Sequence, residues 1–178
     1  GLVARYLLES LAGIPCNVEA ASEYRYRRVV VQPDTLFLAV SQSGETADTL
    51  AALRDGKQRG YLGSLAICNV PESSLVRESD LVLMTRAGPE IGVASTKAFL
   101  AQLAVMAALP INLARAKVKL SHEMEREIVA HLRAVPEAMS HALSHDEEIE
   151  AIAPKIAVAR DVLYLGRDTN CPLAVEGA

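Results

Sequence analysis

Three short apolar runs constrain the fold of this chain more than any other feature. They cover residues 35–40, 65–69 and 81–84, and each has the length of a β-strand. Apolar runs without polar alternation are typical of strands that are covered on both faces, as in parallel sheets. A helix is predicted after the first run, at 47–59, and Gly60 ends it. Strands that alternate with helices predict an α/β fold, a parallel sheet in a three-layer sandwich.

The rest of the chain predicts helices around this sheet and two short strands. Helices are expected at residues 2–11 and 96–108 and from Pro172 onward, and strands at 17–20 and 162–166. From 121 to 159 the chain is helical and more charged, and Pro136 and Pro154 are expected to break or begin segments there. We therefore expect one domain, residues 1–178, with a helical arm at 119–159.

Composition and charge argue against several classes of protein. The formal net charge of -4 gives no basic surface for nucleic acid or an anionic membrane as a whole. The most apolar stretch, 98–109, contains Gln102 and is shorter than the roughly 20 residues that a membrane span needs. It therefore predicts a buried helix.

The cysteines and the chain ends add expectations about the setting of the protein. The three cysteines form no Cys-x-x-Cys pair, which fits free thiols in a reducing cytoplasm and suggests neither zinc nor disulfides. The first residues have none of the features of a signal peptide. We expect both ends to be cuts through a longer protein.

A loop rich in hydroxyl groups follows the first predicted strand and precedes a helix. It contains Ser41, Gln42, Ser43, Gly44 and Thr46. A helix N-terminus offers unpaired amides and a positive dipole end, and Gly44 allows close approach of the backbone. The loop has no lysine and no Gly-x-Gly-x-x-Gly, so it predicts a site for a small phosphomonoester rather than a nucleotide triphosphate. The alternative is a turn in which Ser43 or Thr46 only caps the helix.

A second loop of this kind covers residues 90–97, Glu-Ile-Gly-Val-Ala-Ser-Thr-Lys. It again places glycine and hydroxyl groups before a helix. Alone, it favours a plain Ser/Thr cap over a ligand site. Because both loops follow strands of one parallel sheet, they can converge on one ligand.

Other candidate residues favour structural roles. Glu45 lies in the first helical turn, where the dipole favours a carboxylate, so we expect a structural role rather than a general base. The four histidines lie in the charged arm and suggest a solvated surface rather than a metal site. The run 24–28, Tyr-Arg-Tyr-Arg-Arg, is interpreted as packing or a subunit contact rather than RNA binding. Cys68 is interpreted as a core thiol.

Several segments resemble the glucosamine-6-phosphate synthase family, the isomerising glutamine–fructose-6-phosphate aminotransferases. The resemblance covers nearly the whole chain and is carried by residues 9–16, 41–49, 65–69, 73–80 and 90–99. Many sugar isomerase (SIS) domains share Ser-x-Ser-Gly-x-Thr, whereas the 90–97 block points to this aminotransferase. The resemblance implies the first SIS subdomain of the family's isomerase half.

The resemblance also implies roles for residues on both loops. Ser41, Gln42, Ser43 and Thr46 would hold the sugar phosphate, and Val93 and Ser95 would contact the sugar with Ala94 between them. Family members carry Cys-Gly-Thr-Ser shortly before the position of Gly1. Their catalytic Lys, Glu and His lie beyond the motif matched by residues 174–178. We therefore expect no catalytic residue within the chain, and an inactive fragment.

The expected function is to bind fructose 6-phosphate and glucosamine 6-phosphate in this aminotransferase, at the first step of amino sugar (UDP-N-acetylglucosamine) biosynthesis. No cofactor or metal is implied. The expected partners are the glutaminase domain of the same parent chain and a second copy in a cytoplasmic homodimer, with Tyr24 and Tyr26 at exposed surface. One alternative is a regulatory SIS module that senses a sugar phosphate. Another is an SIS isomerase of pentose or heptose phosphates, which the 90–97 block disfavours.

Overall fold

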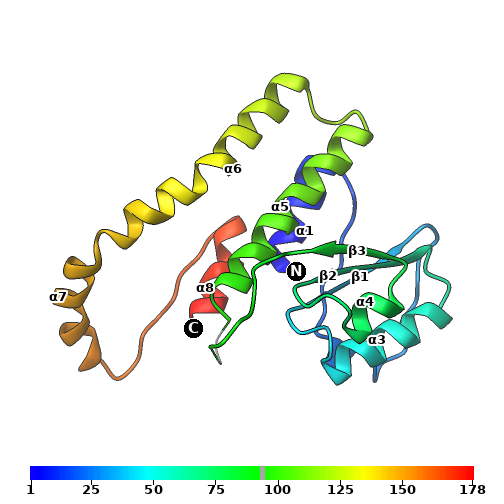
Figure 1. Cartoon of the computed structure of the whole chain (residues 1–178), viewed down its shortest axis with the longest axis horizontal. Helices are drawn as coiled ribbons and strands as arrows, with labels where there is room; N and C mark the ends of the chain where they lie inside the picture. Colours follow the sequence, from blue (N-terminus) through cyan, green and yellow to red (C-terminus); the bar gives the residue numbers. More distant parts are fainter. Residues whose placement is uncertain (93–94) are drawn as a thin grey trace.

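The computed structural model describes residues 1–92 and 95–178 and has a parallel sheet at its centre (Figure 1). The strands are β1 (Leu36–Ser41), β2 (Gly63–Cys68) and β3 (Leu81–Met84), in the order β1-β2-β3. Both strand pairs are parallel, and Val40 lies opposite Ile67, which lies opposite Leu83. The three apolar runs are therefore confirmed as neighbouring strands.

Helices account for most of the remaining chain. They are α1 (Leu2–Ala12), α2 (Ala21–Tyr24), α3 (Ala47–Gln58), α4 (Ser74–Glu78), α5 (Lys97–Ala116), α6 (His122–Leu143), α7 (Asp146–Ala157) and α8 (Cys171–Gly177), with a short 3-10 turn η1 (Asp168–Asn170) before α8. Gly13 ends α1 in the left-handed conformation, with φ 60°, because a residue without Cβ adopts it at little cost.

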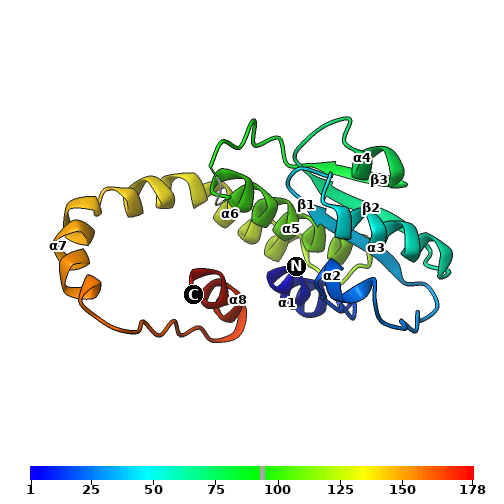
Figure 2. The ribbon, with the colours of Figure 1, turned by 90° about the horizontal axis from the view of Figure 1, so that it is seen from below.

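The sheet is covered by helices on both faces (Figures 1 and 2). Successive side chains of a strand point to opposite faces, so each strand contributes to two cores. On one face, Ala39 and Cys68 pack in a cluster with Leu50 and Leu53 of α3 and Leu75 of α4. The other face has its own cluster, formed by Ala4 of α1, Ile67 of β2 and Met106 of α5. The α/β three-layer sandwich is thus confirmed.

Helix α5 is longer than predicted. It continues through the buried Pro110 to Ala116 and packs against α1 and the sheet. By length and composition alone it could also cross a membrane. Ala98, Met106 and Ile111 are buried, whereas Leu100 is 42% exposed, so the predicted burial of this helix holds for one face only.

Helices α6 and α7 form an arm that extends away from the sheet (Figure 1). No residue of either helix is buried. Pro136 and Pro154 lie inside these helices, so the prediction that they break or begin segments was wrong. A proline removes one backbone hydrogen bond, and the other bonds of a long helix offset that loss. The break falls instead at Ser144, which follows α6.

The two predicted short strands at 17–20 and 162–166 are not formed in the structure. The first leads into α2, which the sequence did not predict, and the second is a non-regular, exposed segment in which Leu163 is 81% exposed. A strand needs a neighbour for its backbone N–H and C=O groups. Within the residues that the structure describes, the sheet has no such neighbour for either segment.

Candidate functional site

The Ser41–Thr46 loop joins β1 to α3 at the carboxyl end of the sheet. Ser41 is the last residue of β1 and is buried, whereas Thr46 is exposed and directly precedes α3. In open α/β sheets ligands bind at this end of the strands. The structure therefore brings the predicted loop residues to one place.

Two loop hydroxyls bond to the loop's own backbone. Ser41 Oγ accepts a hydrogen bond from the Gly44 amide (3.0 Å), and Ser43 Oγ accepts one from the Glu45 amide (3.2 Å). Each hydroxyl keeps its own proton to donate. Thr46 makes no side-chain bond to α3, so the alternative in which it only caps the helix finds no support.

The N-terminus of α3 is open. Its first hydrogen bond runs from the Leu50 amide to the Thr46 carbonyl (3.0 Å), and within the described part of the chain the amides of Ala47, Asp48 and Thr49 have no acceptor. Such amides, together with the helix dipole, attract an anion. The one carboxylate in the first turn, that of Asp48, pairs with Arg25 at 2.6 Å. The pairing offsets its negative charge.

Gly44 places the loop against β2 and the segment before α4. Its φ is 69°, in the left-handed region. A Cβ at this position would lie 2.8 Å from Sγ of Cys68 and 2.6 Å from Cβ of Ser73. Cys68 is fully buried, as predicted for a core thiol, and lies directly beneath the loop. Ser73 had not been singled out from the sequence, because its contact with Gly44 spans distant positions.

The second loop differs from the first, because its helix start is occupied. Glu90 Oε2 accepts hydrogen bonds from the amides of Thr96 (3.2 Å) and Ala98 (3.1 Å) at the start of α5. The bond from Ala98 is the main reason that the pKa of Glu90 is lowered. An internal carboxylate thus fills the anion position that the sequence suggested for a ligand. Ser95 is exposed here, while Val93 and Ala94 lie outside the described residues.

Glu45 points to α4 rather than to α3. Its Oε1 accepts a hydrogen bond from the Ser74 amide at 2.7 Å, and this bond is the main cause of its lowered pKa. A carboxylate that is held ionised by an amide is a weak base. These contacts support the structural role that was expected for Glu45.

The Tyr-Arg run near α2 is mostly internal packing. Tyr24 is buried, with its ring edge-on to Phe37, and its hydroxyl donates to Tyr61 (3.3 Å). Arg27 forms two bonds with Glu19. The expectation that Tyr24 contributes exposed surface was wrong, whereas Tyr26 is 78% exposed.

Of the arm's histidines, those at positions 122, 131 and 141 are exposed and His145 is partly buried. His145 lies 3.2 Å from Glu148, and its ring packs edge-on against His141. Across residues 1–92 and 95–178, no three His, Cys, Asp or Glu side chains are grouped to hold a metal ion.

Two surface hollows involve helices of the arm. One is lined by residues that include Arg115, Arg126 and Arg133, and the other by Ile149, Ile152 and Ile156 among others. Neither includes a residue of the 41–46 loop. The first hollow combines Arg115 of α5 with residues of α6, and the second is formed by α7. The candidate site is therefore the loop, where the predicted residues lie.

Both a family model and curated relatives match this chain. The model of the SIS domain family matches residues 1–111. Glutamine–fructose-6-phosphate aminotransferases (isomerizing) from Pseudomonas putida and Escherichia coli K12 are 60% and 57% identical over all 178 residues. The chain spans only 29% of the length of each.

A solved structure shows that the whole fold recurs. The C-terminal domain of glucosamine-fructose-6-phosphate aminotransferase from Francisella tularensis matches 100% of this chain with a TM-score of 0.97 and 47% identity. The chain covers 50% of that structure. The arm and the sandwich therefore occur together in a longer relative.

Proposed function

Because the chain belongs to the SIS domain family, we propose that its 41–46 loop binds the phosphate of a hexose 6-phosphate. The observation that carries the proposal is the open start of α3, where the amides of Ala47, Asp48 and Thr49 have no acceptor in the described structure. A phosphate dianion at this position would complete these bonds and interact favourably with the helix dipole. The relatives from Pseudomonas putida and Escherichia coli are named for fructose 6-phosphate, a sugar phosphate, which agrees with this ligand class.

The loop supplies neutral donors rather than a charged side chain. Ser41, Ser43 and Thr46 provide hydroxyls and Gln42 an amide, and the loop has no lysine. Hydrogen bonds to a charged acceptor are about twice as strong as neutral ones. These neutral hydroxyl and amide donors suit a monoester phosphate that binds without a metal ion.

The sugar end of the ligand is assigned by resemblance to residues 93–95. Ser95 is exposed at the start of α5, on a loop that follows β3 at the carboxyl end of the sheet. Val93 and Ala94 lie outside the described residues. We propose that Val93 and Ser95 contact the sugar, with Ala94 between them.

We further propose that the parent protein is a cytoplasmic glutamine–fructose-6-phosphate aminotransferase, acting at the first step of amino sugar biosynthesis. Ammonia, released by a glutaminase domain of the same parent chain, adds at the carbonyl carbon of fructose 6-phosphate. A carboxylate then moves a proton between neighbouring carbons, which is general acid–base catalysis. Residues 1–178, as one SIS unit, would supply the anchor that orients the sugar. The proposed chemistry needs no cofactor.

A homodimer is the proposed assembly. The support is the exposed apolar surface of the arm, where Leu143, Ile149 and Ile152 are each more than 48% exposed. Surfaces of this kind commonly mark interfaces. Light scattering of the chain over a range of concentrations tests this proposal. A dimer is expected, and a strict monomer at high concentration would count against an interface within the chain.

Calorimetric titration of the chain with glucosamine 6-phosphate, glucosamine and ATP tests the ligand class. We expect binding of glucosamine 6-phosphate only. Tighter binding of ATP, or equal binding of glucosamine, would show that the loop does not select a sugar monophosphate.

A further inference from the structure

We propose that Ser74 is a positioning residue that keeps the N-terminus of α3 open for the phosphate, because its amide holds the Glu45 carboxylate away from the α3 amides. The inference rests on the proposed function of the 41–46 loop. It assigns to the Ser74 amide a role in affinity that Ser74 performs through Glu45 and not by touching the ligand.

The Glu45 carboxylate has to be held away from the α3 amides because of its position in the chain. Glu45 directly precedes Thr46, so its carboxylate is tethered beside the unpaired amides of α3. A carboxylate near free helix amides binds them, and the chain provides an example. At α5, Glu90 accepts hydrogen bonds from Thr96 and Ala98 and occupies the helix start. The same arrangement at α3 would place a negative charge where the phosphate has to bind.

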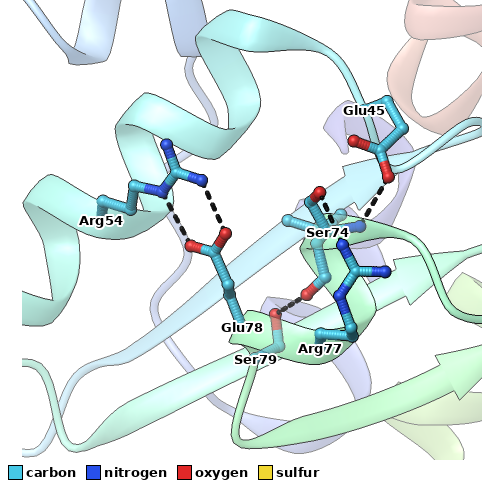
Figure 3. A network of polar contacts seen from close by, with 7 residues as sticks. Glu45, Arg54, Ser74, Arg77, Glu78 and Ser79 are labelled. Carbon is cyan, nitrogen blue, oxygen red and sulfur yellow. Dashed lines mark hydrogen bonds and ion pairs between the residues drawn. The ribbon is translucent and has the colours of Figure 1, made fainter.

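Glu45 is directed elsewhere, as Figure 3 shows. Its carboxylate points to the backbone of Ser74 at the start of α4, with a donor–acceptor distance of 2.7 Å. Arg77 of the same helix lowers the pKa of Glu45 and Glu78 raises it, but the bond to Ser74 has the largest effect. The carboxylate is therefore ionised and engaged outside the phosphate position.

Helix α4 is itself fixed to α3. Arg54 of α3 donates two hydrogen bonds to the Glu78 carboxylate, at 2.8 and 2.6 Å (Figure 3). Within α4, Arg77 donates to Ser74 Oγ at 3.1 Å. Two-point guanidinium–carboxylate contacts define orientation as well as distance. Ser74 is thus held in a set place relative to α3.

The backbone links the loop and α4 a second time. The Leu75 amide donates to the Gly44 carbonyl at 3.0 Å, one residue along from the Glu45–Ser74 bond. This second link is independent of the Glu45 side chain. Loss of the Glu45–Ser74 bond should therefore release the carboxylate while leaving the loop attached.

The chain allows the Glu45–Ser74 bond to be removed from the donor side. Ser74 is the first residue of α4, where proline is well tolerated because its N–H is not needed by the helix. The preceding residue, Ser73, has φ -64° and ψ 160°, which suits a residue before proline. Ser74→Pro deletes the amide that binds Glu45. Ser74→Ala is the matched control, because it keeps the amide and removes the hydroxyl, which accepts the Arg77 bond and is the smaller of the two Ser74 contributions to the lowered pKa of Glu45.

The experiment is a calorimetric measurement of glucosamine 6-phosphate affinity for five forms of the 178-residue chain: wild type, Ser74→Pro, Ser74→Ala, Glu45→Ala and the double variant Glu45→Ala/Ser74→Pro. Ser74→Pro is expected to weaken binding about tenfold, because the released carboxylate competes for the α3 amides. Ser74→Ala and Glu45→Ala should stay within about threefold of wild type, and the double variant should regain affinity because no carboxylate remains to compete.

The double variant separates this role from a merely structural one. If the bond only stiffened the loop, removing both partners would leave binding as weak as in Ser74→Pro. That result, or equal affinities of Ser74→Pro and Ser74→Ala, would overturn the inference. If the wild-type chain binds no glucosamine 6-phosphate, the proposed function fails first and the inference falls with it.

Discussion

Gly44 and Ser73 pack so closely that a Cβ on Gly44 would lie 2.6 Å from Cβ of Ser73. Real Cβ atoms do not approach so closely, and φ of Gly44 is 69°. Gly44→Ala should therefore lower the free energy of unfolding by about 2–5 kcal/mol, the sum of left-handed strain and overpacking. Urea denaturation measures the change.

Gly60→Ala is the matched control for Gly44→Ala. Gly60 also has positive φ, 82°, but nothing lies within 4 Å of its would-be Cβ. Gly60→Ala should therefore lower the free energy of unfolding only by the strain of the left-handed conformation, about 1–2 kcal/mol. Equal losses for the two variants would show that the Ser73 contact does not constrain the loop.

Ser43→Ala and Thr46→Ala should each raise KM for fructose 6-phosphate about tenfold in the full-length parent, the effect of one lost hydrogen bond to a charged group. Glutamine hydrolysis should continue. Ser121→Ala is a control, because Ser121 caps α6 through the Met124 amide, away from the loop. The measurement is steady-state kinetics. An unchanged KM in both loop variants would show that the loop only connects β1 to α3 and does not bind the phosphate.

Glu90→Gln should change how stability depends on pH. The pKa of Glu90 is lowered from 4.5 in the folded chain, so its ionised form stabilises the fold. That stabilisation is complete above the unfolded value and is lost as pH falls through the folded pKa. Urea midpoints measured from pH 3 to 7 should show the wild-type advantage over Glu90→Gln shrinking toward acid. A constant difference across this range would contradict the capping role.

The chain alone should not catalyse the reaction of its relatives. Glu45 is engaged by Ser74, and Glu90 by Thr96 and Ala98, so neither carboxylate is free to move a substrate proton. Incubation with fructose 6-phosphate and ammonia should yield no glucosamine 6-phosphate, and without ammonia no glucose 6-phosphate. Turnover near the rate of a full-length relative would mean that a base lies within residues 1–178.

Much of the sandwich could be predicted from the sequence, because buried parallel strands leave a local signal. The runs at 35–40, 65–69 and 81–84 are apolar without interruption, and each became a strand. The run at 162–166 is apolar as well and formed no strand, and neither did the mixed stretch Asn-Val-Glu-Ala at 17–20. Strand formation also depends on a pairing neighbour, which local composition does not encode.

The position of both loops between a strand and a helix was predictable from the sequence, whereas the difference between their helix starts was not. Both loops offer hydroxyls before a helix, so the sequence could not tell which helix start is open. That difference depends on side-chain directions: Glu90 folds back onto its own helix, whereas Glu45 reaches Ser74, a residue 29 positions away. Likewise, burial of Tyr24 depends on its contact with Phe37.

The most direct test of the central claim is an amide chemical-shift titration of the labelled chain with glucosamine 6-phosphate. We predict saturable shifts at Ala47, Asp48 and Thr49, whose amides have no acceptor in the described structure. Glucosamine, which lacks the phosphate, should cause no such shifts. Binding of glucosamine 6-phosphate with unmoved signals at these three amides would place the phosphate elsewhere and contradict the account.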